Sequence, residues 1–174
     1  MRLFIAINFP DDFRAVIAGL RDYLKEESWA GNFSYDDNLH LTLVFLGECD
    51  IRQVEAIKMI MNNSNFSEFT LNLESIGSFK RYGGGNTWWV GLKENQALSD
   101  LQASLTNSLK QRGFSMENRK FMPHVTIGRE VRVRNGFIQP EVPQAEFTVK
   151  SFELMVSEHI NGKLTYTPIH SVVE

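Results

Sequence analysis

A pattern of histidine, any residue, threonine and an apolar residue occurs twice in this chain, and both copies alternate like β-strands. Successive side chains of a strand point to opposite faces, so the histidine and threonine of each copy share one face. The residues between them face a core. The chain should therefore present two imidazole–hydroxyl pairs on two strands. The copies are His40-Leu41-Thr42-Leu43 and His124-Val125-Thr126-Ile127.

The size and composition of the chain are those of a globular protein. It has 174 residues, of which 43% are hydrophobic and 22% charged, so we expect one domain over residues 1–174 with two intimately packed lobes. No segment has the ~18 consecutive apolar residues of a membrane helix, and no signal-peptide pattern is present. We expect a cytoplasmic monomer. The single cysteine excludes an intrachain disulfide.

The charge balance limits the partners. The net charge is −3, whereas proteins that hold long nucleic acids usually carry a basic face. The longest basic runs are Lys80-Arg81 and Arg119-Lys120. A protein with this charge that acts on nucleic acid is expected to grip an end or a small fragment rather than a long backbone.

Hydrophobic periodicity predicts alternating strands and helices. Glycines at 83–85 form a flexible joint, and residues 31–37 are expected to be a loop. Asp50, with Gln53, is predicted to cap the second helix. The expected strands are 3–9, 39–46, 69–76, 87–92, 122–129, 146–157 and 163–172, and the expected helices are 11–27, 50–61 and 95–112.

An internal repeat is suggested by the distance between the two motifs. His40 and His124 lie 84 positions apart. The same offset places Asp11, which with Asp12 is a candidate cap of the first predicted helix, on Asn95, the expected cap of the third. We therefore predict an α+β fold of two pseudo-symmetric lobes. Each lobe is an antiparallel sheet with helices on its outer face, and the two motif strands line a central cleft.

The motifs and their flanks resemble the 2H phosphoesterases, and within them the RNA 2′,3′-cyclic phosphodiesterases, also called 2′-5′ RNA ligases. The resemblance covers the whole chain. It depends on the opening Met1-Arg2-Leu3-Phe4-Ile5-Ala6-Ile7, on Asn38-Leu39-His40-Leu41-Thr42-Leu43-Val44-Phe45-Leu46-Gly47 and on Phe121-Met122-Pro123-His124-Val125-Thr126-Ile127-Gly128-Arg129.

The resemblance implies hydrolysis of RNA 2′,3′-cyclic phosphate ends to 2′-phosphomonoesters, without a metal or other cofactor. It assigns His40 as proton donor to the leaving 3′ oxygen and His124 as proton acceptor from water. Arg129 is a phosphate-binding candidate, although strict alternation would turn it away from the histidine face unless the strand bulges. Met122 occupies a position that is often basic in the family.

The residue types support this chemistry independently. Displacement at phosphorus needs a base for water and an acid for the departing oxygen, and imidazole serves both roles near neutral pH. Thr42 and Thr126 are expected to donate hydrogen bonds to the non-bridging oxygens. Phe45 is a candidate for stacking on the base, as are Tyr82, Trp88 and Trp89.

Alternative functions remain open at this stage. The chain could hold RNA ends without turnover, or act on a small cyclic nucleotide such as an ADP-ribose cyclic phosphate. Run in reverse, the same two histidines would make 2′-5′ linkages. A metallohydrolase using both histidines with Asp36 or Asp37 is the weakest alternative, because the sequence lacks a close ligand cluster.

Overall fold

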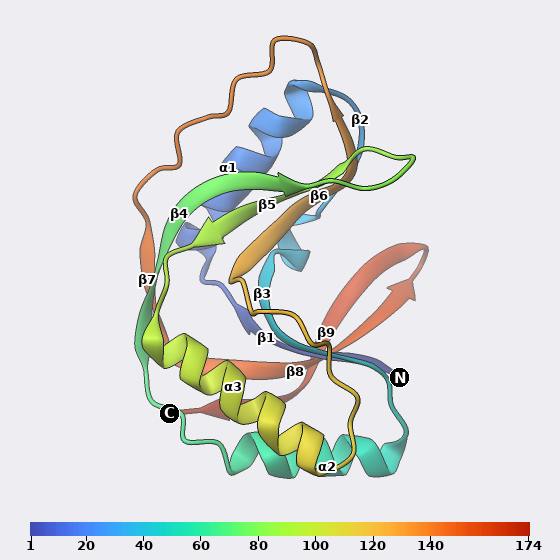
Figure 1. Ribbon diagram of the computed structural model, residues 1–174, viewed down its shortest axis with the longest axis vertical. Coiled ribbons are helices and arrows are strands. Elements are labelled where there is room, and N and C mark those ends of the chain that lie inside the picture. The colour runs from blue at the N-terminus through green and yellow to red at the C-terminus, as the bar shows by residue number, and fades with distance from the viewer.

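The computed structural model describes residues 1–174, which form two antiparallel sheets, three α-helices and one short 3₁₀ helix (Figure 1). None of the helices combines the length and apolarity that crossing a membrane requires. The elements in chain order are β1 (Arg2–Asn8), α1 (Asp11–Glu26), β2 (Ser28–Phe33), η1 (Asp36–Asn38), β3 (His40–Glu48), α2 (Ile51–Asn62), β4 (Phe69–Phe79), β5 (Asn86–Leu92), α3 (Gln96–Gln111), β6 (His124–Val133), β7 (Glu146–Val149), β8 (Ser151–Ile160) and β9 (Lys163–Val173).

The sheets form two lobes. The first sheet has the order β3-β1-β8-β9 and the second the order β2-β6-β5-β4-β7. The motif strands β3 and β6 belong to different sheets and contact each other where the lobes meet. The predicted α+β architecture of two antiparallel sheets, with a motif strand in each, is therefore confirmed.

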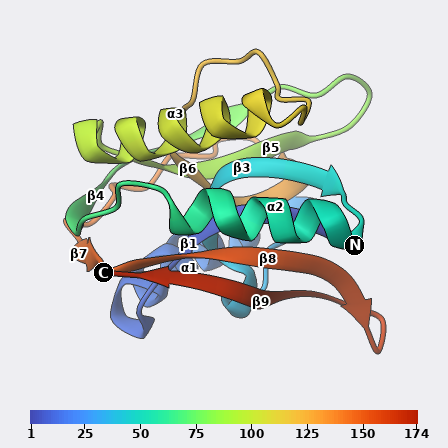
Figure 2. The ribbon, with the colours of Figure 1, turned by 90° about the horizontal axis from the view of Figure 1, so that it is seen from below.

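The helices are exchanged between the two halves of the chain. α1 follows β1 of the first sheet but packs against β2 and β6 of the second, whereas α3 follows β5 of the second sheet and packs against β3 of the first. α2 and α3 lie side by side (Figures 1 and 2). A single cluster of 35 buried residues therefore joins both sheets and all three helices.

The helix starts follow capping chemistry at two of three positions. The Asp50 carboxylate accepts from the Gln53 amide and the Gln53 side chain accepts from the Asp50 amide, so the predicted capping box is confirmed. The Asn95 side chain caps α3. The expectation of an aspartate cap at the first helix is wrong, because Pro10 is the N-cap residue of α1 and makes no side-chain cap.

Two predicted segments differ from the structure. The stretch expected to be a loop, residues 31–37, overlaps the end of β2, which pairs with β6 at the edge of the second sheet, and the start of η1. The strand expected over 146–157 is divided at Lys150 into β7, which pairs with β4, and β8, which pairs with β1. This division lets one stretch of chain supply both sheets.

The two motif strands pair with their neighbours in the same register. In each lobe, four residues of the motif strand pair with four consecutive residues of the neighbouring strand, but the residue directly after the threonine has no partner. That extra residue is Leu43 in β3 and Ile127 in β6. Each motif strand therefore contains a β-bulge directly after its threonine. The pairs are Asn8–His40, Ile7–Leu41, Ala6–Thr42 and Ile5–Val44 in the first lobe, and Gly91–His124, Val90–Val125, Trp89–Thr126 and Trp88–Gly128 in the second.

Candidate active site

His40 begins β3 on the face of the first sheet that the helices leave uncovered. Its Nδ1 lies 2.7 Å from the carbonyl oxygen of Asn38, and its Nε2 lies 2.8 Å from Oγ1 of Thr42. The ring is half-buried between the rings of Phe4 and Tyr166, whose centroids lie 4.9 Å and 5.2 Å away. Neighbours on two strands thus fix the orientation of His40.

His124 begins β6 in the equivalent position of the second lobe. Its Nδ1 lies 2.6 Å from the carbonyl oxygen of Met122, again two residues earlier. The rings of Phe79 and Trp89 pack at its edge, with centroid distances of 5.6 Å and 6.4 Å. Each histidine is therefore held by one carbonyl and two aromatic side chains.

The carbonyl contacts decide which nitrogen of each ring carries a proton in the neutral form. A carbonyl oxygen only accepts, so Nδ1–H of both His40 and His124 must donate to it. The Nε2 atoms then carry the free lone pairs. In both histidines the nitrogen available for proton transfer is Nε2, and in His40 it is the nitrogen beside the Thr42 hydroxyl.

The bulges bring two more predicted residues onto the histidine face. An extra residue in a strand reverses the alternation beyond it, so Phe45 in β3 and Arg129 in β6 face the same way as His40 and His124. Both side chains are exposed. The bulge that Arg129 requires is present, and Phe45 and Arg129 are themselves 84 positions apart.

A cationic side chain from β1 joins this face. The guanidinium carbon of Arg2 lies 5.1 Å from the ring centroid of Phe45. Burial raises the pKa of the Tyr166 phenol, against the opposing effect of the positive charges of Arg129 and Arg2. These two arginines therefore come from different sheets and both act on one phenol beside His40, which places positive charge around the histidine face.

The environment of His40 disfavours its charged form. Burial lowers the pKa of His40 to about 4, assisted by the charges of Arg129 and His124 and opposed by the hydrogen bond to the Asn38 carbonyl. The imidazole of His40 is therefore neutral at neutral pH in the free protein. The charge of His124 thus acts on His40 from the other lobe.

The three other aromatic candidates for stacking lie in different surroundings. Trp88 is buried against Phe137 in the core and is unavailable to a ligand. Trp89 lies on the histidine face, where its indole covers Gly77 of β4 and leaves no space for a Cβ there. Tyr82, at the tip of the β4–β5 loop, is fully exposed and away from His124.

A short segment before the first motif connects the two motif strands. The Ser34 hydroxyl donates to the carbonyl oxygen of Thr126 at 3.0 Å, and the Ser34 amide donates to that of Ile127. At the other end of the segment, the Asn38 carbonyl holds His40. Residues 34–38 therefore couple the position of His40 to β6 in the other lobe.

The segment is itself fixed on both sides. Arg21 of α1 donates to the Ser34 carbonyl at 2.9 Å and pairs with the Asp36 carboxylate. The structure contains no group of three or more His, Cys, Asp or Glu side chains arranged to bind a metal ion. Asp36 thus pairs with a guanidinium rather than contributing to a ligand cluster.

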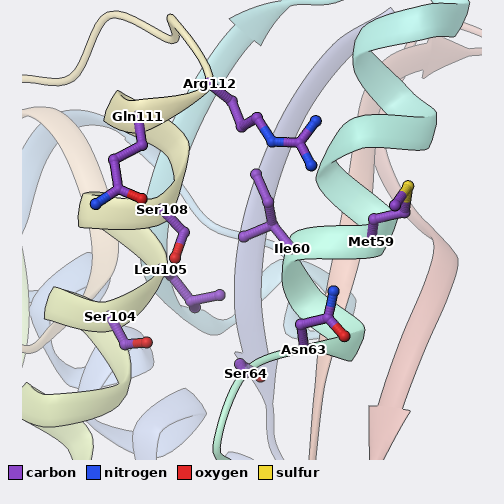
Figure 3. Close-up of a pocket in the computed structure, with 9 residues that line it drawn as sticks. All are labelled: Met59, Ile60, Asn63, Ser64, Ser104, Leu105, Ser108, Gln111 and Arg112. Atoms are coloured by element: carbon purple, nitrogen blue, oxygen red, sulfur yellow. The ribbon is translucent and has the colours of Figure 1, made fainter.

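A cavity of about 370 Å³ lies between α2 and α3 (Figure 3). Side chains from both helices, among them Asn63, Ser104, Ser108 and Arg112, line it. No residue of either histidine motif belongs to it. The cavity is therefore separate from the candidate site.

Sequence reasoning missed Phe4, Tyr166, Phe79, Arg2 and Asn38. Alternation in β1 does separate Arg2 and Phe4 from the core residues, but it does not indicate which face carries the histidines. Tyr166 and Phe79 are brought to the site only by the pairing of distant strands. These contacts can be identified only once the pairing of the strands is known.

The comparisons with known proteins all indicate the same family. The model of the 2′-5′ RNA ligase superfamily matches residues 9–161. The RNA 2′,3′-cyclic phosphodiesterase of Thermotoga maritima is 33% identical over 131 residues, covering 74% of this chain and 70% of that protein. The enzyme of the same name from Escherichia coli is 31% identical over 170 residues, covering 97% and 93%.

The fold comparison agrees with the sequence comparison. The crystal structure of Escherichia coli LigT complexed with 3′-AMP superimposes with a TM-score of 0.83 at 29% identity, covering 99% of this chain and 97% of that one. The resemblance drawn from the two motifs is thereby confirmed. The chain belongs to the 2′-5′ RNA ligase superfamily, the two-histidine phosphoesterases.

Proposed function

We propose that this protein hydrolyses the 2′,3′-cyclic phosphate at an RNA end to a 2′-phosphomonoester. The observation that carries the proposal is the paired placement of His40 and His124, each with Nδ1 bound to a main-chain carbonyl, which leaves Nε2 as the nitrogen for proton transfer; Nε2 of His40 lies beside the Thr42 hydroxyl. Relatives that share at least 31% identity bear the name RNA 2′,3′-cyclic phosphodiesterase. The substrate class is taken from them.

The proposed reaction is an in-line displacement. A water oxygen bonds to phosphorus while His124 accepts a proton from it, and the bond from phosphorus to O3′ breaks while His40 donates a proton to O3′. Each positioned proton transfer contributes roughly 10²- to 10⁴-fold to the rate. The product carries the phosphate on O2′ and a free 3′ hydroxyl.

Threonine and arginine are proposed to stabilise the phosphate as negative charge moves onto its oxygens. Thr42 and Thr126 lie on the histidine face, each two residues after its histidine, and Arg129 lies beyond the bulge of β6 on the same face. Hydroxyl and guanidinium donors fixed before the reaction stabilise that charge without reorganising. We propose Phe45, exposed beside Arg2, as a stacking surface for the terminal base.

The role of His40 as acid requires a change on substrate binding. Burial holds the pKa of His40 at about 4 in the free protein, so the ring is neutral before substrate arrives. A bound phosphodiester is an anion, and an adjacent anion favours the imidazolium. We therefore propose that the substrate itself raises the pKa of His40 and prepares it as the proton donor.

A ligation reaction uses the same groups. If the 5′ hydroxyl of a second RNA replaces water, attack on the cyclic phosphate releases O3′ and forms a 2′-5′ linkage. His124 then takes the proton from that hydroxyl. We include this reversible ligation in the proposal as a second outcome of one site.

The proposal is tested with an RNA oligonucleotide that ends in a 2′,3′-cyclic phosphate, in excess chelator. We expect turnover by the parent protein and loss of it in His40→Ala and His124→Ala, with His170→Ala as the matched control. RNA binding without turnover would indicate a non-catalytic module. Turnover only of small cyclic nucleotides would reassign the substrate, and loss of activity in chelator would contradict a metal-independent reaction.

A further inference from the structure

The histidine face of β6 continues outward past the candidate site. Beyond Arg129 a second irregularity follows, where Glu130 has a φ of 54° and the register with β5 and β2 shifts again. Arg129 pairs with Asn32 of β2, and Arg132 pairs with Ala30 two residues before it. Arg132 therefore follows Arg129 along the same side of the sheet, two pairs or about 7 Å further along the strand.

Aromatic side chains accompany Arg132. Its guanidinium carbon lies 5.5 Å from the ring centroid of Trp29, whose side chain is 65% exposed. On its other side, Arg132 reaches the carbonyl oxygen of Gly83 in the β4–β5 loop, next to the fully exposed Tyr82. We name these three side chains, Trp29, Tyr82 and Arg132, the Trp29 surface.

Arg132 of this surface lines a hollow of about 350 Å³ between β2, β6 and the β4–β5 loop. The loop is held against β6 at Gly85, where a Cβ would lie 2.4 Å from the carbonyl oxygen of Val131. Only glycine permits this approach. The loop projects on the same side of the molecule as the β8–β9 hairpin (Figure 1).

Positively charged side chains gather in this region, although the net charge of the chain is negative, and they can attract an anion. Arg129 and Arg132 lie on one face of the sheet, and Lys80 and Arg81 begin the β4–β5 loop whose Gly83 carbonyl Arg132 reaches. Glu130, which lines the same hollow as Arg132, has its carboxylate bound by the side-chain amide of Asn32 at 2.9 Å. Neither Arg129 nor Arg132 forms an ion pair with a carboxylate, so both are available to phosphate.

From these observations we propose that the Trp29 surface binds the single-stranded RNA on the 5′ side of the reacting nucleotide. This inference rests on the proposed function, because it takes the phosphate beside Arg129 as the reacting one. Single-stranded RNA is bound by combining cationic side chains along its backbone with aromatic side chains that stack on its bases. Trp29 stacks on a base and Arg132 contacts the phosphate next to it.

The test compares two substrates with the same reacting group: adenosine 2′,3′-cyclic phosphate, and a pentanucleotide ending in that nucleotide. Trp29→Ala is expected to lower kcat/KM for the pentanucleotide about fivefold or more and leave the mononucleotide unchanged. Trp29→Phe should restore most of the loss. Arg132→Ala should reduce the slope of log kcat/KM against log salt by roughly 0.7 for the pentanucleotide.

The control is Arg52→Ala, which removes an exposed arginine from α2 and should change neither substrate. Equal effects of Trp29→Ala on both substrates, or no effect on either, would overturn the inference. If the parent hydrolyses neither substrate, the proposed function fails, and fluorescence anisotropy of the labelled pentanucleotide then tests the surface alone. If Trp29→Ala weakens binding of the pentanucleotide at least fivefold, the result supports the inference. Binding that is absent in the parent or unchanged in the variant overturns it, as does a Trp29 surface that binds only protein.

Discussion

The carbonyl oxygen of Asn38 lies 2.7 Å from Nδ1 of His40, and the side-chain amide of the same asparagine donates to the carbonyl oxygen of Leu164 at 2.9 Å. One buried residue therefore fixes the ring of the histidine and also joins the segment before β3 to β9. The orientation of His40 depends on a contact 126 residues away in the sequence.

Loss of the Asn38 amide should loosen His40. Asn38→Ala and the isosteric Asn38→Asp both remove the donor to Leu164, and leaving a buried carbonyl without its donor costs about 1–3 kcal/mol of unfolding free energy. We expect kcat to fall about tenfold with KM little changed, because the main-chain carbonyl remains but its position is less fixed. Steady-state kinetics and urea unfolding measure both effects.

The control for this pair of variants is Asn62→Ala, which removes an exposed asparagine that bonds to His170 away from the motifs. It should leave kcat unchanged. An Asn38→Ala variant with lower stability but the kcat of the parent would show that the contact supports the fold and not the ring.

The stability of the protein should depend on pH through His40. Its pKa is about 4 in the folded protein against about 6.5 in an unfolded chain, so the unfolded state binds more protons between these values. The free energy of unfolding is therefore highest above pH 6.5 and falls by up to about 3 kcal/mol as the pH is lowered through 6.5 to 4.

His40→Gln should remove this part of the pH dependence, which urea unfolding at pH 7.5 and pH 4.5 will measure. His170→Gln, at a half-buried histidine outside both motifs, serves as the comparison. A His40→Gln variant that loses as much stability as the parent on acidification would contradict the low pKa of His40.

The assignment of His40 as proton donor predicts a shift on ligand binding. The pKa of its ring, followed by NMR, should be about 4 in the free protein and rise by more than one unit when an RNA 2′-phosphate product saturates the site, because the bound anion favours the imidazolium. A pKa that stays at about 4 in the complex would reverse the assignment and make His40 the base.

Arg129 should contribute to binding of the phosphate. A charge-assisted hydrogen bond contributes about 1.5–3 kcal/mol, so Arg129→Ala is expected to lower kcat/KM roughly 10- to 150-fold for mononucleotide and oligonucleotide substrates alike. Arg129→Lys should recover part of it. Arg52→Ala is the matched control, and an effect confined to long substrates would place Arg129 with the Trp29 surface instead.

The architecture and the four motif side chains were predictable because they depend on local pattern. Alternation alone places His40 beside Thr42 and His124 beside Thr126, and a capping signature marks the start of α2. These features need only the spacing of residues near each other in the chain.

The remaining features depend on pairing between distant segments. The bulges that turn Phe45 and Arg129 toward the histidines follow from register and leave no mark in alternation. The exchange of α1 and α3 between lobes is equally invisible locally. Tyr166 reaches His40 only because β8–β9 completes the first sheet.

The most direct test of the account is turnover of an RNA with a 2′,3′-cyclic phosphate end in ¹⁸O-labelled water, with the product identified by mass and by ³¹P NMR. We predict a 2′-phosphomonoester carrying one ¹⁸O from the parent, and no product from His40→Ala or His124→Ala. A 3′-phosphate product, or turnover that survives the loss of both histidines, would contradict the two-histidine mechanism.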